Sequence, residues 1–311
     1  MPIVKRALII GGTGSLGKAL ARHLPIKFPG IQITVLSRCE HKQAAMKKLF
    51  PDVKCVLGDI RCKDSISRHF FNKDMVFHVA ALKCVDVVED NPTESVRTNI
   101  LGTMNVAECA ISHNVPQVMF SSTDKAVDPI NVYGCCKSIS EKILLDYNKT
   151  QQVTRFSIYR WGNVAGSQGS AIPYFIDCLK NNKPVPVTDE RMTRFWITLD
   201  TAIDFVLSTM GSVKTYDNVL LPTFMKGAKI VDVIKTLADL VGIFNYSTTI
   251  IGLRPGEKIH ESLSSVHGKD FISSDTCEQF GEEELKTLLY PFVHNGEQRP
   301  YNAKVIPICP A

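Results

Sequence analysis

Two short polar stretches carry the residues whose types and spacing suit acid–base chemistry. The first is Ser121-Ser-Thr-Asp-Lys125, and a Tyr-x-x-x-Lys pair made of Tyr133 and Lys137 follows it. On a helix, residues four apart lie on the same face. A lysine ammonium beside a phenol favours the phenolate, so we expect Tyr133 to act as a general base near neutral pH. Asp124 and Lys125 supply a second acid–base pair on the same loop.

The elements around this polar cluster place it at the end of a strand. The apolar run Gln117–Phe120 precedes it, and a helix-periodic pattern with Ile139, Ile143 and Leu144 follows it. Open α/β sheets bind their ligands at the carboxyl ends of their strands. A Tyr-x-x-x-Lys spacing also occurs by chance on ordinary helices, but the neighbouring Ser-Thr-Asp-Lys stretch favours a functional site.

A glycine-rich turn near the start of the chain indicates a dinucleotide site. The apolar strand Ala7–Ile10 runs through glycines at 11, 12, 14 and 17 into a helix, which fits the pattern G-x-G-x-x-G. Such glycines let the backbone approach a pyrophosphate, which then meets the helix N-terminus. A plain glycine turn is the alternative. The cofactor-binding residues predicted here are Gly11, Thr13, Gly14, Ser15, Leu16 and Gly17.

The end of the second strand indicates which dinucleotide binds. NAD-binding proteins often place an acid there to bind the ribose hydroxyls. In this chain the strand Gln32–Leu36 ends in Ser37 and Arg38, with Lys42 close behind. A hydroxyl and two cations suit a 2′-phosphate, so we predict NADP as the cofactor, although Arg38 is alternatively a solvated surface charge.

Two further strands end in residues that suit the rest of the cofactor. Lys54–Leu57 leads to Asp59, which either holds the adenine amino group or caps the next helix. Met75–Val79 opens onto small residues that let a cofactor lie against the backbone. In the helical stretch 94–113, Asn99 either bonds backbone or holds a structural water. The additional cofactor-binding residues predicted are Asp59, Ile60, Ala80, Ala81, Lys83 and Asn99.

Composition excludes several classes of protein. The chain has 311 residues, of which 44% are hydrophobic, and a formal net charge of +5. Without a basic run, this charge suits an anionic small molecule better than a nucleic acid. We find no signal peptide and no apolar run that could span a membrane, so we expect a cytoplasmic protein. The ten cysteines are scattered without a C-x-x-C, which disfavours disulfides and a metal site.

The order of strands and helices predicts two domains. Regular alternation up to residue 163 predicts an α/β protein with a doubly wound parallel sheet of the Rossmann type. A helix over Asp200–Met210 is expected to return to this domain, giving 1–163 plus about 198–225. Residues 164–197 plus about 226–275 would form a smaller substrate domain, and 276–311 is a tail without an assigned role. Arg194 and Arg254 suggest a second phosphate site, although a solvated basic loop is the alternative.

Taken together, these motifs resemble the extended short-chain dehydrogenases/reductases. The similarity rests on Gly-Gly-Thr-Gly-Ser-Leu-Gly, Ser-Thr-Asp-Lys-Ala, Asn-Val-Tyr-Gly-x-x-Lys and Arg-x-Gly-Asn-Val-x-Gly-Ser. More narrowly, the chain resembles the inverting UDP-N-acetylglucosamine 4,6-dehydratases that start pseudaminic acid synthesis. The narrower match rests on Ala80–Lys83, on Lys125 after Asp124, on Met192–Ile197 and on Leu253–Lys258.

The resemblance implies a reaction in which NADP is recycled. Tyr133, with Thr123 and Lys137 completing a triad, would take the proton of the sugar's 4-hydroxyl while hydride leaves C4. The 4-ketone acidifies C5, whose proton a neutral Lys125 would remove, and a protonated Asp124 would assist loss of the 6-hydroxyl as water. Hydride returning to C6 and protonation of C5 from the opposite face would give the inverted sugar.

The resemblance also implies a UDP-sugar partner and a homo-oligomer, either a dimer or a hexamer. The substrate-binding residues that it implies are Lys83, Thr123, Asn163, Thr193, Arg194, Arg254 and Glu257. Four positions depart from the family pattern, namely Cys84, Cys135, Cys136 and Trp161. Two alternatives remain open. One is a retaining 4,6-dehydratase or a C4-epimerase of the same fold, and the other is a non-catalytic nucleotide-binding subunit.

Overall fold

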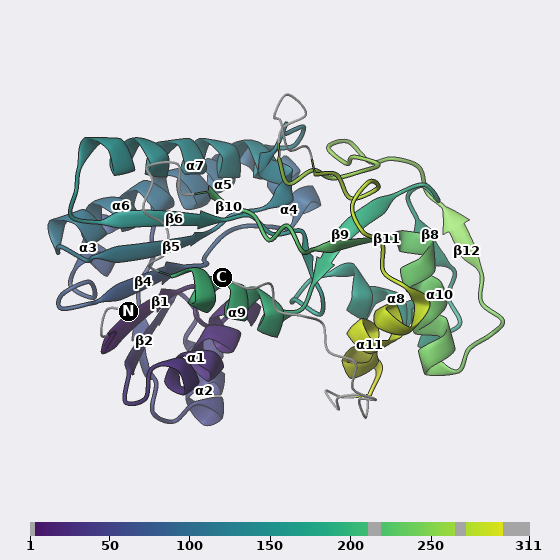
Figure 1. Ribbon diagram of the computed structural model, residues 1–311, viewed down its shortest axis with the longest axis horizontal. Coiled ribbons are helices and arrows are strands. Elements are labelled where there is room, and N and C mark those ends of the chain that lie inside the picture. The colour runs from purple at the N-terminus through teal and green to yellow at the C-terminus, as the bar shows by residue number, and fades with distance from the viewer. Residues whose placement is uncertain (1–3, 211–218, 265–271, 295–311) are drawn as a thin grey trace.

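The computed structural model describes residues 4–210, 219–264 and 272–294. A larger half is built on one long sheet, and a smaller half with two short sheets lies beside it (Figure 1). None of the helices in these ranges combines the length and the apolar character needed to cross a bilayer.

The main sheet has seven parallel strands in the order β10-β6-β5-β4-β1-β2-β3. The order reverses beside β1, which lies between β2 and β4, so this is the point where such sheets bind ligands. The strands are β1 (Arg6–Ile10), β2 (Gln32–Ser37), β3 (Lys54–Leu57), β4 (Met75–His78), β5 (Gln117–Ser121), β6 (Arg155–Tyr159) and β10 (Val219–Leu220). The predicted doubly wound parallel sheet is confirmed.

Helices cover both faces of this sheet because its strands are apolar on both sides. In β1, Ala7 and Ile9 are buried in one core cluster, and Leu8 and Ile10 are buried in another on the opposite face. The longer helices are α1 (Ser15–Lys27), α2 (Glu40–Leu49), α6 (Gly102–Ser112), α7 (Val132–Thr150) and α9 (Leu199–Thr209). The shorter ones are α3 (Lys63–Ser67), α4 (Val85–Asp90), α5 (Pro92–Ser95), the π-helical η1 (Val96–Leu101) and the 3-10 turn η2 (Asp124–Ala126).

The smaller half has its own core. Its sheets have the orders β11-β9-β7 and β12-β8, and Trp196, Val233 and Leu289 are buried together beneath them. The strands are β7 (Asn163–Val164), β8 (Val185–Val187), β9 (Thr193–Ile197), β11 (Lys226–Lys229) and β12 (Thr248–Ile250). The helices are α8 (Ala171–Lys180), α10 (Ile230–Val241) and α11 (Glu282–Val293).

The chain passes between the halves more than once. After β9 it returns to the larger half as α9, whose Ala202 and Ile203 are buried in the cluster that also contains Leu20 of α1. It then adds β10 to the edge of the main sheet beside β6. The return helix predicted over Asp200–Met210 is therefore present.

The segment that we predicted as a tail without a role contains a structured element. Helix α11 buries Leu285, Leu288 and Leu289 in the core of the smaller half. These leucines have helical spacing, so the pattern was visible in the sequence, and the capping interaction of Glu284 with the Gly281 backbone N–H marks the helix start. Residues 295–311 of the predicted tail lie outside the described ranges.

Candidate functional site

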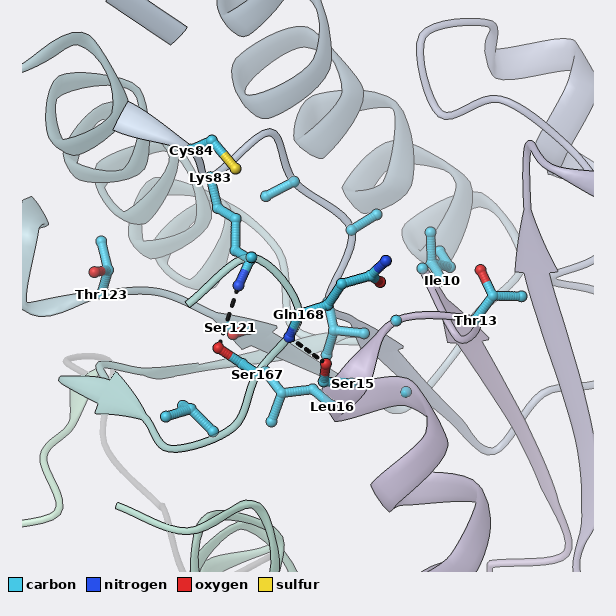
Figure 2. Close-up of a pocket in the computed structure, with 18 of the residues that line it drawn as sticks. Ile10, Thr13, Ser15, Leu16, Lys83, Cys84, Ser121, Thr123, Ser167 and Gln168 are labelled. Atoms are coloured by element: carbon cyan, nitrogen blue, oxygen red, sulfur yellow. Dashed lines mark hydrogen bonds between the residues drawn. The ribbon is translucent and has the colours of Figure 1, made fainter. Parts of the chain in front are cut away.

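A cleft of about 680 Å³ lies along the carboxyl ends of the main-sheet strands. It is lined by the glycine turn after β1, by the residues that follow β2, β4 and β5, and by segment 161–171, which leads into the smaller half. Figure 2 shows Thr13, Ser15 and Leu16 on one side of it, and Lys83 and Thr123 farther along. The cleft therefore joins the two motif regions singled out from the sequence.

The glycine turn leaves its backbone bare toward the cleft. A Cβ on Gly11 would lie 2.7 Å from the Ala80 backbone, and one on Gly17 would lie 2.3 Å from the Gly12 backbone. Gly11 also has a φ of +81°, which side chains disfavour. Helix α1 starts at Ser15, so its free N–H groups meet the cleft. The turn thus fits a pyrophosphate at a helix N-terminus.

Gly17→Ala should weaken dinucleotide binding, because the added methyl group must displace the Gly12 backbone. We expect a loss of affinity of about tenfold or more, because the shifted turn misplaces N–H groups that would bind the pyrophosphate, and one hydrogen bond to a charged group contributes roughly 1.5–3 kcal/mol. Gly281→Ala is the control, since Gly281 has a φ of −70°, does not line the cleft, and a Cβ there would meet only Glu284 Oε2, at 3.7 Å. Fluorescence titration with a reduced nicotinamide dinucleotide measures both, and equal affinities would contradict the assignment of the turn.

The cationic end of β2 also borders the cleft. Ser37, Arg38 and Lys42 all line it. Asp59 does not, because Arg61 holds its carboxylate at 2.6 Å and Arg38 lies 3.9 Å away. Burial raises the pKa of Asp59, but these arginines outweigh burial and lower it overall. Ile60, next in the chain, does line the cleft.

Asn99 supports the wall of the cleft without lining the cleft itself. Its side chain accepts from the Leu82 N–H and donates to the Leu82 carbonyl, both at 2.9 Å. This pair of bonds fixes the loop that carries Ala80, Ala81 and Lys83 into the cleft. Asn99 is buried and does not line the cleft. Of its two predicted roles, bonding the backbone or holding a structural water, the structure therefore shows the bond to the backbone.

The turn η2 presents a compact charged group after β5. The Asp124 side chain is fully buried, and Thr123 Oγ1 donates to its Oδ1 at 3.0 Å. Lys125 Nζ lies 3.1 Å from Asp124 Oδ1 and 3.3 Å from Glu261 Oε1. Thr123 and Lys125 line the cleft. Sequence reasoning missed Glu261, whose only signal was its place in the charged loop after β12.

The charge state of Lys125 differs from the expectation of a neutral amine. Burial lowers the pKa of Lys125, but Asp124 and Glu261 outweigh burial and raise that pKa above its usual value. The two carboxylates therefore keep Lys125 as an ammonium in this arrangement.

Helix α7 places Tyr133 and Lys137 beside this group. Asn131 caps the helix by accepting from the Gly134 N–H at 2.7 Å. Lys137 Nζ donates to the Ser121 carbonyl at 2.7 Å and lies 4.3 Å from the Phe120 ring centroid. Both Tyr133 and Lys137 line the cleft, as the shared helix face predicted.

The expected phenolate is not favoured in this arrangement. Burial raises the pKa of Tyr133 to about 12, although Lys125 and Thr123 act in the opposite direction. Burial also lowers the pKa of Lys137 to about 7, against the pull of Glu141. With a pKa of about 7, Lys137 is partly uncharged at neutral pH and therefore does little to stabilise the neighbouring phenolate.

Two contacts link the larger half to the segment before α8 across the cleft. Lys83 Nζ lies 3.3 Å from Ser167 Oγ, and the Gln168 N–H donates to Ser15 Oγ at 2.9 Å (Figure 2). Cys84, beside Lys83, and Trp161 also line the cleft, so two of the departures from the family pattern are at the site. Ser167 and Gln168 were not predicted.

The residues implied to bind substrate separate into two groups. Asn163, at the start of β7, lines the cleft together with Lys83 and Thr123. The others lie outside its lining. Thr193 Oγ1 is 2.8 Å from His260 Nδ1. Arg194 donates to the carbonyls of Thr193, Lys258 and Ile259. Arg254 forms ion pairs with Glu257 and Asp86.

Comparison with known proteins identifies relatives along most of the chain. Residues 7–279 match the polysaccharide biosynthesis protein family. An inverting UDP-N-acetylglucosamine 4,6-dehydratase of Campylobacter jejuni is 39% identical over 266 residues, which cover 84% of this chain and 78% of that protein. A UDP-glucose 4-epimerase of Rickettsia bellii is 40% identical over 279 residues, covering 85% and 79%.

A solved structure agrees with this relationship. Pen from Bacillus thuringiensis superimposes with a TM-score of 0.83 and 34% identity, covering 92% of this chain and 97% of that one. The chain belongs to the polysaccharide biosynthesis protein family, whose members are extended short-chain dehydrogenases/reductases with sugar-nucleotide dehydratases and epimerases among them.

Proposed function

We propose that the protein is a UDP-N-acetylglucosamine 4,6-dehydratase that inverts C5. The observation that carries this proposal is the acid–base pair of Asp124 and Lys125 beside Tyr133, with Lys125 and Tyr133 both lining the cleft. Epimerisation at C4 requires a base for one hydroxyl, whereas elimination across C5 and C6 requires a second base and an acid. The 39% identity to an inverting enzyme of this type supports the same choice.

The proposed cofactor is NADP, and the residues present fit it. The glycine turn would hold the pyrophosphate, and Arg38 with Lys42 would face the 2′-phosphate. When bound, the cofactor would accept a hydride from C4 of the sugar and return it to C6. Tyr133 and Lys137 line the cleft, and the sugar would lie beside them.

The proton steps follow from the charged group on η2. Tyr133 would first release its own phenol proton to solvent, and the phenolate would then take the proton of the 4-hydroxyl as C4 is oxidised. Transfer of the Lys125 proton to Asp124, 3.1 Å away, would give a neutral amine and a carboxylic acid together. The amine would then take the C5 proton, and Asp124 would give its proton to the departing 6-hydroxyl, which leaves as water.

The substrate's nucleotide would lie on the smaller half. Asn163 lines the cleft there, and Arg254 forms its two ion pairs on an exposed loop from which it can turn to a diphosphate. Thr193 and Arg194 would contribute indirectly, because their hydrogen bonds hold the loop 258–260 in place.

Incubation with UDP-N-acetylglucosamine in heavy water, followed by NMR of the product, tests this function. We expect a 4-keto-6-deoxy sugar with deuterium at C5 and inverted configuration at that carbon. A product that retains the C5 configuration would indicate a retaining dehydratase. Formation of UDP-N-acetylgalactosamine without loss of water would indicate a C4-epimerase, and both results would overturn the proposal.

Removing the two cations at the end of β2 tests whether the cofactor is NADP rather than NAD. The double change Arg38→Ala and Lys42→Ala should lower NADP affinity by about tenfold or more, since one charge-assisted bond contributes roughly 1.5–3 kcal/mol. NAD affinity should change little. Calorimetric titration with both cofactors measures the ratio, and an equal loss for NAD and NADP would argue against a 2′-phosphate at this position.

A further inference from the structure

We propose that Glu261 is a positioning residue for Lys125, holding its ammonium at the wall of the cleft and setting how readily it gives up and regains a proton. The proposal rests on the function proposed above, because it concerns the base assigned to the C5 proton. Glu261 does not line the cleft, and its carboxylate contacts the Lys125 ammonium, so we assign it an effect on Lys125 rather than a proton step on the sugar.

The contact is a buried ion pair shared between three groups. Glu261 Oε1 lies 3.3 Å from Lys125 Nζ, and its side chain is only 3% exposed. Among the residues that the structure describes, neither Glu261 Oε2 nor Asp124 Oδ2 has a hydrogen-bond partner. Two buried carboxylates thus share one ammonium, and each keeps one free oxygen that can accept a proton.

The backbone of Glu261 is held firmly by the smaller half. Its N–H donates to Ser274 Oγ at 3.0 Å, and the Ser274 N–H donates to the Glu261 carbonyl at 2.8 Å. Ser274 Oγ in turn lies 2.7 Å from Thr193 Oγ1 in β9. This network fixes the backbone position from which the Glu261 carboxylate reaches Lys125.

The charges around Lys125 explain what Glu261 contributes. Lys125 faces Asp124 on η2, Glu261 on the loop after β12, Arg194 on β9 and Tyr133 on α7. Burial and Arg194 favour the neutral amine, whereas the two carboxylates favour the ammonium and outweigh them. Removing the charge of Glu261 therefore lowers the proton affinity of Lys125.

The proton balance of the cycle requires a carboxylate that stays ionised. As Lys125 gives its proton to Asp124, an N–H bond breaks and an O–H bond forms, and Glu261 is unchanged. When Lys125 takes the C5 proton, the electron pair of the C–H bond stays on the sugar as an enolate. Glu261 then pairs with the new ammonium, and the Asp124 proton leaves in water, so the three groups regain their starting charges. C5 takes its new proton from solvent on the opposite face, which balances the phenol proton that Tyr133 released to solvent.

Trace labelling of lysine amines with acetic anhydride tests this proposal without substrate. The rate at Lys125 is followed from about pH 7 to about pH 11 by mass spectrometry, since only the neutral amine reacts. We expect Glu261→Gln to raise that rate by about tenfold or more near pH 9, because an opposite charge at this distance moves a pKa by about one to three units.

Two matched variants separate charge from structure. Glu261→Asp keeps the charge, and Asp275→Asn alters the same segment at a carboxylate that faces Ser273 and His260 rather than Lys125. In both variants, acetic anhydride should label Lys125 at a rate within about twofold of the rate in the unchanged protein. A Glu261→Gln profile that superimposes on that of the unchanged protein would overturn the proposal, as would an equal shift in Glu261→Asp.

The labelling result and the proposed function can fail independently. If labelling shifts as expected but UDP-N-acetylglucosamine is not converted, the dehydratase function is wrong and the effect of Glu261 on Lys125 stands. If the unchanged protein exchanges C5 deuterium and inverts the sugar while labelling does not shift, the function stands and Glu261 has a structural role only.

Discussion

Tyr133→Phe should lose turnover by about a hundredfold to ten-thousandfold, the range typical of a removed general base. The phenol is the group that would take the 4-hydroxyl proton, and without it the sugar cannot be oxidised at C4. Dinucleotide affinity should remain close to that of the unchanged protein, because the glycine turn and the cations after β2 are untouched. Initial rates with UDP-N-acetylglucosamine and fluorescence titration measure the two quantities.

Tyr147→Phe provides the matched control for this variant. Tyr147 belongs to the same helix α7, but its hydroxyl reaches Glu108 at 3.4 Å, and it does not line the cleft. This change should leave turnover within about twofold, because it keeps the partly buried ring and removes only a hydroxyl that lies outside the cleft. Near-normal turnover in Tyr133→Phe would remove Tyr133 from the mechanism.

Lys125→Arg should abolish exchange at C5 while leaving the protein folded. Arginine keeps the positive charge between Asp124 and Glu261, so neither carboxylate is left unpaired, but it does not deprotonate in proteins. We expect C5 deuterium incorporation to fall by at least about a hundredfold. NMR in heavy water measures that exchange, and partial oxidation at C4 should still be detectable as a transient 4-ketone.

Lys125→Ala extends this test to stability. Removing one partner of a buried ion pair typically costs about 3–5 kcal/mol, because the remaining charges are left uncompensated. The alanine variant should therefore melt well below the arginine variant in a thermal unfolding experiment. Unchanged C5 exchange in Lys125→Arg would exclude Lys125 as the base, whatever the stability of Lys125→Ala.

The fold was predictable because local and long-range signals agree. The apolar strand Ala7–Ile10, the glycine turn and the helix from Ser15 follow one another as a dinucleotide fold requires. Parallel strands end at one edge, so the glycine turn and the Ser-Thr-Asp-Lys stretch had to meet there. Tyr133 and Lys137 could be placed in the same cleft from helical spacing alone.

The protonation of the site could not be predicted from the sequence. A nearby lysine was expected to favour the Tyr133 phenolate, but burial outweighs it and raises the pKa to about 12. Lys125 was expected to be neutral, but its charge depends on Glu261, which lies far along the chain and in the other half. Residue types give the sign of each interaction, whereas their balance depends on depth and distance.

The roles of the arginines were also beyond the sequence. Arg194 was predicted as a phosphate ligand, yet its guanidinium donates to carbonyls of Thr193, Lys258 and Ile259 inside the fold. In the sequence, an arginine in an apolar strand looks the same whether it binds a phosphate or backbone carbonyls. Both roles use the same guanidinium N–H donors. Only the neighbouring loop, folded back on β9, determines which acceptors it finds.

The repeated passage of the chain between the halves restricts how such an enzyme can diversify. Because α9 and β10 interrupt the smaller half in sequence, a single genetic crossover cannot exchange that half as an intact module. A hybrid joined near residue 163 would receive β10 and α9 from one parent and their packing partners in α1 and β6 from the other. New sugar preferences in this architecture are therefore expected to arise by point changes in loops rather than by recombination of whole halves.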